Sequence, residues 1–450
     1  MKKTLDIKKL ILLNMPYILM GLFATNFGEA WRLAQGANAS EKFLSLFAVL
    51  PGALQSFWPS LHPLDLLVGL CCGAGLRLAV YLKSKNAKKY RHGMEYGSAR
   101  WGTPKDIEPF MAPKFADNII LTKTERLMMS NRPPDPKNAR NKNVLVVGGS
   151  GSGKTRFFVK PNALQCSGSY FFLDPKGELT YSLGGAMEEN GVTVTVIDFV
   201  HFRGHYNPVA YLKTDEDAMK LAYALVFNTK KNPAASGGEN EFWDKSAVMF
   251  LASLILYILY ESPLYERNLN TMMDMILECK VSEDSYDENR MDILFGELEQ
   301  RDPHHPAVLQ YRSFKLGSAK TLSSIMVTAV SNLHMLQSAA FAEMIATDEM
   351  FLPKLGVEKR AIFCVIPDND DTFNFMVSIL YTQLFDQLFR LADSTPEFHG
   401  TLPVHVRLMM DEFANVATPE NFVKILAVAR SRNISCDIIL HNISQIKSKY

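Results

Sequence analysis

The sequence lacks the features that mark several classes of protein. Its 450 residues carry 48 lysines and arginines against 47 aspartates and glutamates, so it has neither the basic excess of a DNA-coating protein nor the acidic bias of a disordered tail. The six cysteines form no C-x-x-C pair and have no histidines at zinc spacing, which argues against a disulfide framework and against a zinc site. We expect these thiols to be buried or membrane-facing in a reducing compartment. Any contact with nucleic acid must be local.

Two long apolar runs set the start of the chain apart. Leu10–Ala24 is apolar except for Asn14, and Leu64–Leu82 has charges only near its ends, at Asp65 and Arg77. Each run approaches the roughly 20 residues that a bilayer span requires. We therefore predict two transmembrane helices, with a cleaved signal peptide as the alternative for the first run.

Basic residues precede the first run and follow the second. Because cytoplasmic flanks collect lysine and arginine, and the intervening loop offers chiefly Arg32 and Lys42, both ends are predicted to face the cytoplasm. Within that loop, Phe43–Trp58 is predicted to be interfacial or extracytoplasmic, with half of the second span as the alternative. The stretch after the second run is expected to set topology and touch anionic lipid, with DNA binding as the alternative. The flanking basic residues are Lys2, Lys3, Lys8, Lys9, Lys83, Lys85, Lys88, Lys89 and Arg91.

The most specific motif is a glycine-rich loop between an apolar strand and a helical segment. Residues 143–155 read NVLVVGGSGSGKT, which contains the G-x-x-x-x-G-K-[ST] pattern of phosphate-binding loops. Glycines let backbone N–H groups and the helix N-terminus point at phosphates. Lys154 should then reach the β and γ phosphates of ATP, and the Thr155 hydroxyl should coordinate Mg²⁺. The predicted nucleotide-binding residues of the loop are Gly148, Gly149, Ser150, Gly151, Ser152, Gly153, Lys154 and Thr155.

A second acidic element follows near the end of the chain. The extended run Val404–Met410 leads into Asp411 and Glu412. Asp411 is predicted to hold Mg²⁺ together with Thr155, and Glu412 to orient the attacking water. A carboxylate in this place is typical of motor ATPases, whereas GTPases use glutamine and small kinases need no hydrolytic base. The predicted enzyme is therefore a P-loop ATPase.

About six short apolar strands alternate with helical patterns. This arrangement is typical of a parallel sheet covered on both faces, in which polar residues at the carboxyl ends of the strands lie over a ligand crevice. On that rule Asp174 should lie near the nucleotide. Gln445 should sense the γ-phosphate, with a surface glutamine as the alternative. The predicted strands are Val144–Val147, Tyr170–Asp174, Val192–Asp198, Ala361–Ile366, Val404–Met410 and Cys436–Leu440.

Between the two motifs lies a long helical interval. It contains the apolar-rich stretch Phe242–Leu256 and no convincing alternating strand, so we predict an inserted all-α domain. The apolar part Val248–Leu259 is too short to span a bilayer and is expected to be core.

The order of motifs resembles the type IV secretion system coupling proteins of conjugative DNA transfer. The resemblance covers nearly the whole chain and is more specific than the phosphate loop alone. It rests on the phosphate loop, Asp174–Leu179, Tyr206–Pro208, Phe242–Lys245, Leu408–Phe413 and Ala429–Asn433, with Gly97–Gly102 after the membrane segment.

The resemblance implies a multi-pass ATPase of the bacterial inner or plasma membrane, with its soluble domains in the cytoplasm and a RecA-like core. Such proteins work as homo-hexamers that bring relaxase-bound single-stranded DNA to a type IV secretion channel. Arg430, or else Arg432, is the candidate to complete a neighbour's site, with solvated basic residues as the alternative. His441 stands where the family usually has glutamine, so the sensing role falls to Gln445. The family continues beyond Tyr450, so the core is expected to be incomplete at its C-terminal end.

These expectations define five segments and two rival functions. One rival is a septal DNA translocase, which gives no reason for the helical insert. The other is a substrate receptor that binds nucleotide but turns it over negligibly. The predicted segments are a membrane domain (1–90), a membrane-proximal connector (91–140), the two parts of the nucleotide-binding domain (141–213 and 346–450) and the inserted all-α domain (214–345).

Overall fold

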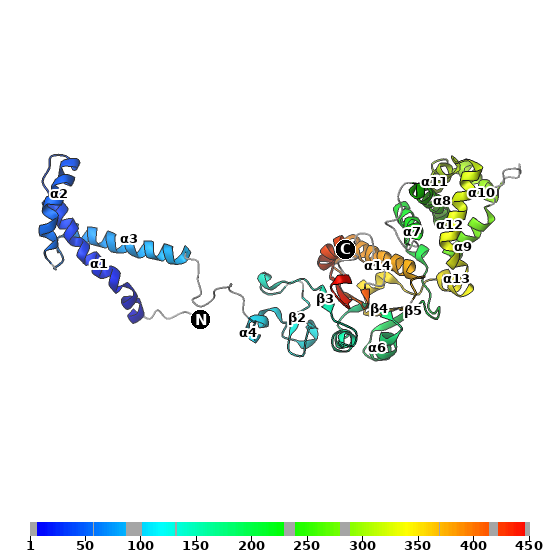
Figure 1. Ribbon diagram of the computed structural model, residues 1–450, viewed down its shortest axis with the longest axis horizontal. Coiled ribbons are helices and arrows are strands. Elements are labelled where there is room, and N and C mark those ends of the chain that lie inside the picture. The colour runs from blue at the N-terminus through cyan, green and yellow to red at the C-terminus, as the bar shows by residue number, and fades with distance from the viewer. Residues whose placement is uncertain are drawn as a thin grey trace. The chain divides into compact units, whose positions relative to one another are not determined.

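The computed structural model divides the chain into two compact units, Met1–Trp101 and Gly102–Tyr450 (Figure 1). Several predicted features lie outside the described residues: the basic residues Lys2, Lys3, Lys88, Lys89 and Arg91, and positions 97–100 of the Gly97–Gly102 motif. The structure describes residues 7–56, 58–86, 101–130, 133–228, 239–279, 289–368, 370–413 and 422–445.

The first unit is built from α1 (Ile7–Leu33), α2 (Ala39–Leu54) and α3 (Pro63–Asn86). Helices α1 and α3 pack as an antiparallel hairpin, and a Cβ atom on Gly69 would lie 2.5 Å from the carbonyl oxygen of Gly21. Only glycine permits so close a backbone approach, and small residues at helix contacts are common in membrane proteins. Because α2 is a helix separate from α3, the alternative that Phe43–Trp58 forms half of the second span is wrong. Its interfacial position stays a prediction.

Among the described residues, two helical segments are long and apolar enough to cross a bilayer. Pro63–Lys85 in α3 is 11% buried, and Glu241–Glu261, in a helix of the second unit, is 72% buried. The exposed apolar surface of α3 agrees with the predicted second span, whereas the burial of Glu241–Glu261 agrees with the prediction that its apolar part is core. The first predicted run lies within α1, and its crossing of the membrane stays a prediction.

A six-stranded, all-parallel sheet forms the centre of the second unit, in the order β3-β8-β7-β4-β6-β5. All six predicted strands are confirmed. Strand β8 lies between β3 and β7, so Val147 pairs with Leu440 and Met410 pairs with Ile438. The carboxyl ends of these three strands therefore meet at one edge. The strands are β3 (Val144–Val147), β4 (Ser169–Pro175), β5 (Thr193–Asp198), β6 (Arg360–Ile366), β7 (Val406–Met410) and β8 (Ile434–Leu440).

Helices cover both faces of this sheet. Alternate residues of β4 enter different cores, Phe171 and Leu173 on one face and Tyr170 and Phe172 on the other, as the two-residue period of a strand dictates. Burial on both faces explains why the strands are nearly continuous apolar runs. The first face is covered by α14 (Asn374–Ser394) and α15 (Phe422–Ala429), and the second by α5 (Lys160–Ala163) and α6 (Glu178–Glu189).

Where the structure describes it, the region that the sequence predicted as an insert contains seven α-helices, drawn in green and yellow in Figure 1. The described residues between 214 and 345 contain no strand, so the all-α prediction is confirmed, and Phe250 and Leu254 of the central helix are fully buried. The boundaries of the five predicted segments stay predictions. The seven helices are α7 (Asp215–Phe227), α8 (Glu239–Glu261), α9 (Leu269–Glu278), α10 (Arg290–Arg301), α11 (Pro306–Lys315), α12 (Ala319–Leu333) and α13 (Ala339–Ala346).

A small antiparallel hairpin precedes the sheet. It consists of β1 (Asn118–Ile120) and β2 (Arg126–Met128) and follows the short helix α4 (Pro104–Ile107). Ile119, at the centre of β1, is fully buried in the core on the α5 and α6 face. The hairpin is thereby packed onto the core of the second unit.

Candidate nucleotide site

The glycine-rich loop leaves the carboxyl end of β3 and turns directly into a helix. Its start is fixed where the Gly148 N–H donates to the Leu440 carbonyl, 3.1 Å away on β8. Gly151 and Gly153 have φ angles of 73° and 82°, a conformation that glycine adopts without strain. A Cβ atom on Gly153 would lie 2.5 Å from the Phe157 ring. The loop therefore needs glycine to hold this anion-binding shape.

Lys154 immediately precedes the helical turn Thr155–Val159, which continues into α5, and its ammonium group is folded over the loop. Its Nζ atom donates to the carbonyl oxygens of Gly148 at 2.6 Å and Gly149 at 3.2 Å. The Nδ1 atom of His441 lies 3.5 Å from the same ammonium group. These contacts hold the positive charge beside the loop, where phosphates are expected.

Thr155 and Asp411 meet across the site. The Thr155 hydroxyl donates to Oδ2 of Asp411 at 2.9 Å, although the two residues are far apart in sequence. Asp411 is 8% exposed at the end of β7. Burial raises the pKa of its carboxyl group above the ordinary value, and the hydrogen bond from Thr155 opposes that rise. The structure thus brings together the two residues predicted to hold Mg²⁺.

Glu412 has an unusual backbone conformation. Its φ angle of 51° lies in the left-handed region, which costs free energy for a residue with a side chain. Its N–H donates to Oδ1 of Asp411 at 3.1 Å, and its Oε1 atom lies 3.4 Å from Nε2 of His441. The strained turn keeps the predicted water-orienting carboxylate beside the predicted metal ligand.

His441 is a site residue that the sequence interpretation did not assign. It follows β8, and since β8 lies between β3 and β7, its imidazole reaches both Lys154 and Glu412. The rule that placed Asp174 at the site, a polar residue at the carboxyl end of a strand, applies equally to His441.

Two further predicted residues, Asp174 and Gln445, have contacts within the chain. Asp174 accepts from the N–H groups of Leu179 and Thr180 and from the Thr180 hydroxyl, at 2.9, 2.7 and 2.6 Å. Its buried carboxylate thus anchors the start of α6, and its contact with nucleotide stays a prediction. Gln445 accepts with its Oε1 atom from the His441 N–H at 2.8 Å, which stabilises the turn after β8.

Arg430 lies at the amino ends of the strands, whereas the phosphate loop lies at their carboxyl ends. It belongs to a short turn, Arg430–Arg432, that immediately precedes β8, whereas the loop follows the carboxyl end of β3. Since β3 and β8 are parallel, these two positions are at different ends of the strands. Arg430 therefore cannot complete the site of its own chain. Arg432 is held by Asp393, with Nη2 2.7 Å from Oδ2.

A buried ionic network underlies the site. Arg407 on β7 and Asp437 on β8 are 2% and 0% exposed, and Nε of the arginine donates to the carboxylate. Arg407 also donates to Oδ1 of Asn162 at 2.9 Å. Asn162, which follows the phosphate loop, in turn bonds both the N–H and the carbonyl of Ile120 in β1, at 2.9 and 2.8 Å. The loop helix is thus tied to the sheet and to the hairpin. This network was not predicted from the sequence. The sequence signal that could have indicated it is a charged residue within each of two apolar strand runs.

The site fits a nucleotide with Mg²⁺. At Gly149 and Gly151 no other heavy atom lies within 4 Å of the place that a Cβ atom would take, so the loop backbone is open to close approach there. The described residues contain no cluster of three or more His, Cys, Asp and Glu able to hold a metal. Thr155 and Asp411, which are joined by a 2.9 Å hydrogen bond, would supply two oxygen ligands, and phosphates and water the others, a set that Mg²⁺ favours.

Comparisons with known proteins place this arrangement in a family. The family described as "Type IV secretory system Conjugative DNA transfer" matches residues 112–450. Two conjugal transfer proteins TraG of Escherichia coli are 22% and 23% identical over 414 and 416 residues, and each alignment covers 85% of this chain. The chain spans 62% of the length of these curated relatives.

Solved structures show the same fold. The bacterial conjugative coupling protein TrwBdeltaN70, in a trigonal form with sulphate, superposes with a TM-score of 0.52 and 15% identity over 80% of this chain and 76% of that chain. Its unbound monoclinic form gives a TM-score of 0.51 and 16% identity over 78% and 71%. Together with the family match, this confirms the resemblance drawn from the motifs. The chain belongs to the family of type IV secretory system conjugative DNA transfer proteins.

Proposed function

We propose that this chain is a membrane-anchored ATPase that recruits relaxase-bound single-stranded DNA and drives its transfer through a type IV secretion channel. The observation that carries the proposal is the meeting of Lys154, Thr155, Asp411 and Glu412 at one edge of the sheet, in a chain of the conjugative transfer family. The family match favours conjugative transfer over septal translocation.

ATP with Mg²⁺ is the proposed ligand of the site. Bound Mg²⁺ would neutralise charge on the phosphates. Lys154 would neutralise the β and γ phosphates, the loop N–H groups would cradle them, and Thr155 and Asp411 would hold the ion. Glu412 would orient the attacking water and accept its proton, while His441 would keep the Glu412 carboxylate in place.

The proposed assembly is a homo-hexamer in the bacterial inner or plasma membrane. The position of Arg430, at the sheet edge away from the loop of its own chain, supports a role in the site of a neighbouring copy. Two spans, within α1 and α3, would leave the second unit in the cytoplasm. DNA would be bound without sequence preference, because the proposed contact is with the backbone of a single strand.

The experiment is a mating assay. A donor that lacks its own copy of this protein is complemented with the wild-type chain, Lys154→Ala or Glu412→Gln. We expect transfer to be restored by the wild type only, with both variants present in the membrane at wild-type amounts. Full transfer by both variants would contradict an ATP-driven role and would favour a substrate receptor with little turnover.

A further inference from the structure

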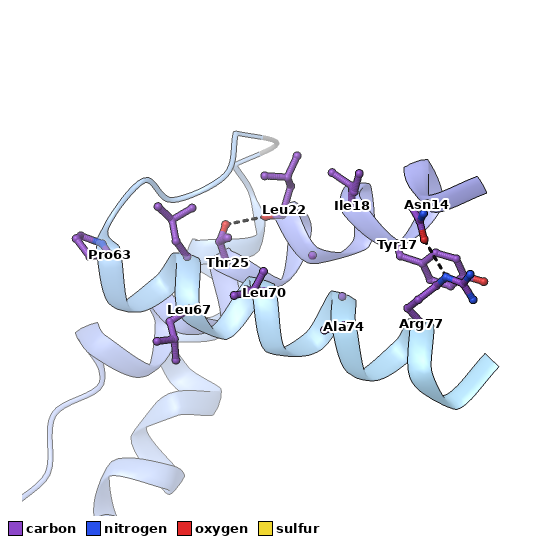
Figure 2. Close-up of a pocket in the computed structure, with 14 residues that line it drawn as sticks. Asn14, Tyr17, Ile18, Leu22, Thr25, Pro63, Leu67, Leu70, Ala74 and Arg77 are labelled. Carbon is purple, nitrogen blue, oxygen red and sulfur yellow. Dashed lines mark hydrogen bonds between the residues drawn. The ribbon is translucent and has the colours of Figure 1, made fainter. Parts of the chain in front are cut away.

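The hairpin of α1 and α3 encloses an apolar groove of about 670 Å³ (Figure 2). Its walls include Ile18 and Leu22 of α1 and Leu67 and Leu70 of α3. Ile18, Leu67 and Leu70 are more than half exposed, at 53%, 59% and 73%. In a bilayer, hydrocarbon chains cover such a surface at no cost, whereas in water it would be an exposed patch.

One end of the groove carries a cation. Arg77 donates with Nε to Oδ1 of Asn14 at 2.8 Å, and its guanidinium lies 5.3 Å from the centre of the Tyr17 ring, as Figure 2 shows. Within the described part of the chain, no carboxylate lies within 4.0 Å of Arg77. Arginine with no counter-charge in a membrane helix is costly unless it meets an anion or water.

The other end of the hairpin provides a contrast. There Arg32 is paired with the buried Asp65, with Nη2 3.1 Å from Oδ2, so its charge is compensated inside the protein. The charge of Arg32 is thus neutralised within the hairpin, whereas the charge of Arg77 would be neutralised by an anion from outside it. That anion must reach an apolar groove, which selects for an amphiphile.

We propose that this groove seats one anionic phospholipid, with an acyl chain along Ile18, Leu22 and Leu70 and its phosphate at Arg77. The inference rests on the membrane insertion proposed above. The guanidinium offers a fork of N–H donors that matches phosphate oxygens, and Tyr17 is of the type that gathers at membrane interfaces. By the predicted orientation, Arg77 lies toward the cytoplasmic leaflet, where lipid anions attract basic residues.

The first test measures lipid selectivity. The full chain is purified in detergent, supplied with equal amounts of phosphatidylglycerol and phosphatidylcholine, and analysed by native mass spectrometry for retained lipid. We expect one retained phosphatidylglycerol in preference to phosphatidylcholine, and a loss of about fivefold in that preference for Arg77→Gln. A double variant Lys83→Gln/Lys85→Gln, which removes two basic residues from the last turn of α3, should keep the preference. If the preference instead survived Arg77→Gln and were lost in the double variant, diffuse surface charge would account for it and the proposal would be overturned.

The second test locates the occupant. A photoreactive residue at Leu70 should cross-link to phospholipid, whereas a product of twice the protein mass would show that a second copy covers the groove and would overturn the proposal. Leu70→Trp, which fills the groove and keeps Arg77, should also lose the retained lipid. A chain absent from the membrane fraction would overturn both the proposed anchoring and this inference. A membrane-bound chain without lipid preference would overturn this inference alone.

Discussion

The Nε2 atom of His441 lies 3.4 Å from Oε1 of Glu412, and Nδ1 of the same ring lies 3.5 Å from the ammonium group of Lys154. One imidazole therefore bridges the residue that should neutralise phosphate and the residue that should orient water. The bridge exists because β8 is inserted between β3 and β7, so the residue after β8 emerges between the two motifs.

His441→Ala should lower kcat for ATP hydrolysis by about tenfold, because the charged Glu412 carboxylate loses the hydrogen bond from the imidazole that fixes its position. The KM for ATP should change much less, since the loop is intact. His441→Gln, which can still donate to Glu412, should retain most of the activity. Steady-state kinetics of the three proteins measure the effect, and an unchanged kcat in His441→Ala would contradict a positioning role.

Thr155→Ala and Asp411→Asn should each raise the Mg²⁺ concentration needed for half-maximal hydrolysis, because both side chains are proposed to hold the same ion. For the same reason the loss of apparent Mg²⁺ affinity in the double variant should be smaller than the sum of the losses in the two single variants. The difference, a coupling free energy, should be about 1 kcal/mol or more. Mg²⁺ titrations of hydrolysis give all four values.

A matched control exists at the start of α6. Thr180→Ala removes another threonine–aspartate hydrogen bond, the 2.6 Å contact with Asp174. It should leave the Mg²⁺ dependence unchanged. A shift as large as that of Thr155→Ala would mean that Asp174 acts at the nucleotide after all.

The sequence predicted the elements of the site better than their side-chain contacts. The phosphate loop, all six strands and the pairing of Thr155 with Asp411 followed from local patterns, because apolar runs and glycine spacing carry that information. Strand order cannot be read from such patterns. Without knowing that β8 separates β3 from β7, the sequence could not place His441 between Lys154 and Glu412. The engagement of Asp174 by α6 is a local contact with N–H groups five and six residues further along the chain, and the rule about strand ends does not describe it.

Arg407→Met should destabilise the fold by about 3 to 5 kcal/mol, because the carboxyl group of Asp437, which is fully buried, would be left without its partner. The double variant Arg407→Met/Asp437→Leu should recover much of that loss, since no buried charge remains. Denaturant midpoints of the purified protein measure both. If the single variant were as stable as wild type, the ionic network would not contribute to stability.

Lys142 should make stability depend on pH in the alkaline range. The side chain is 3% exposed, and burial together with the charge of Arg430 lowers its pKa from 10.5 to about 8. Its charge therefore opposes folding below pH 8, by about 3 kcal/mol, and this penalty disappears as the pH rises from about 8 toward 10.5.

The variant Lys142→Met tests this assignment. It should melt at a higher temperature than wild type at pH 7, and the difference in Tm should shrink at pH 10, where the lysine is neutral in the folded protein. A difference in Tm that stays constant between these two pH values would show that Lys142 does not titrate as assigned.

The most direct test of the account is ATP hydrolysis by the detergent-solubilised chain, with and without single-stranded DNA. We expect Mg²⁺-dependent turnover that DNA stimulates, that Lys154→Ala abolishes, and that falls by about a hundredfold or more in Glu412→Gln while ATP is still bound. Mg²⁺-dependent ATP binding without turnover in the wild type, or equal turnover in Glu412→Gln, would contradict the assignment of this site as the motor of DNA transfer.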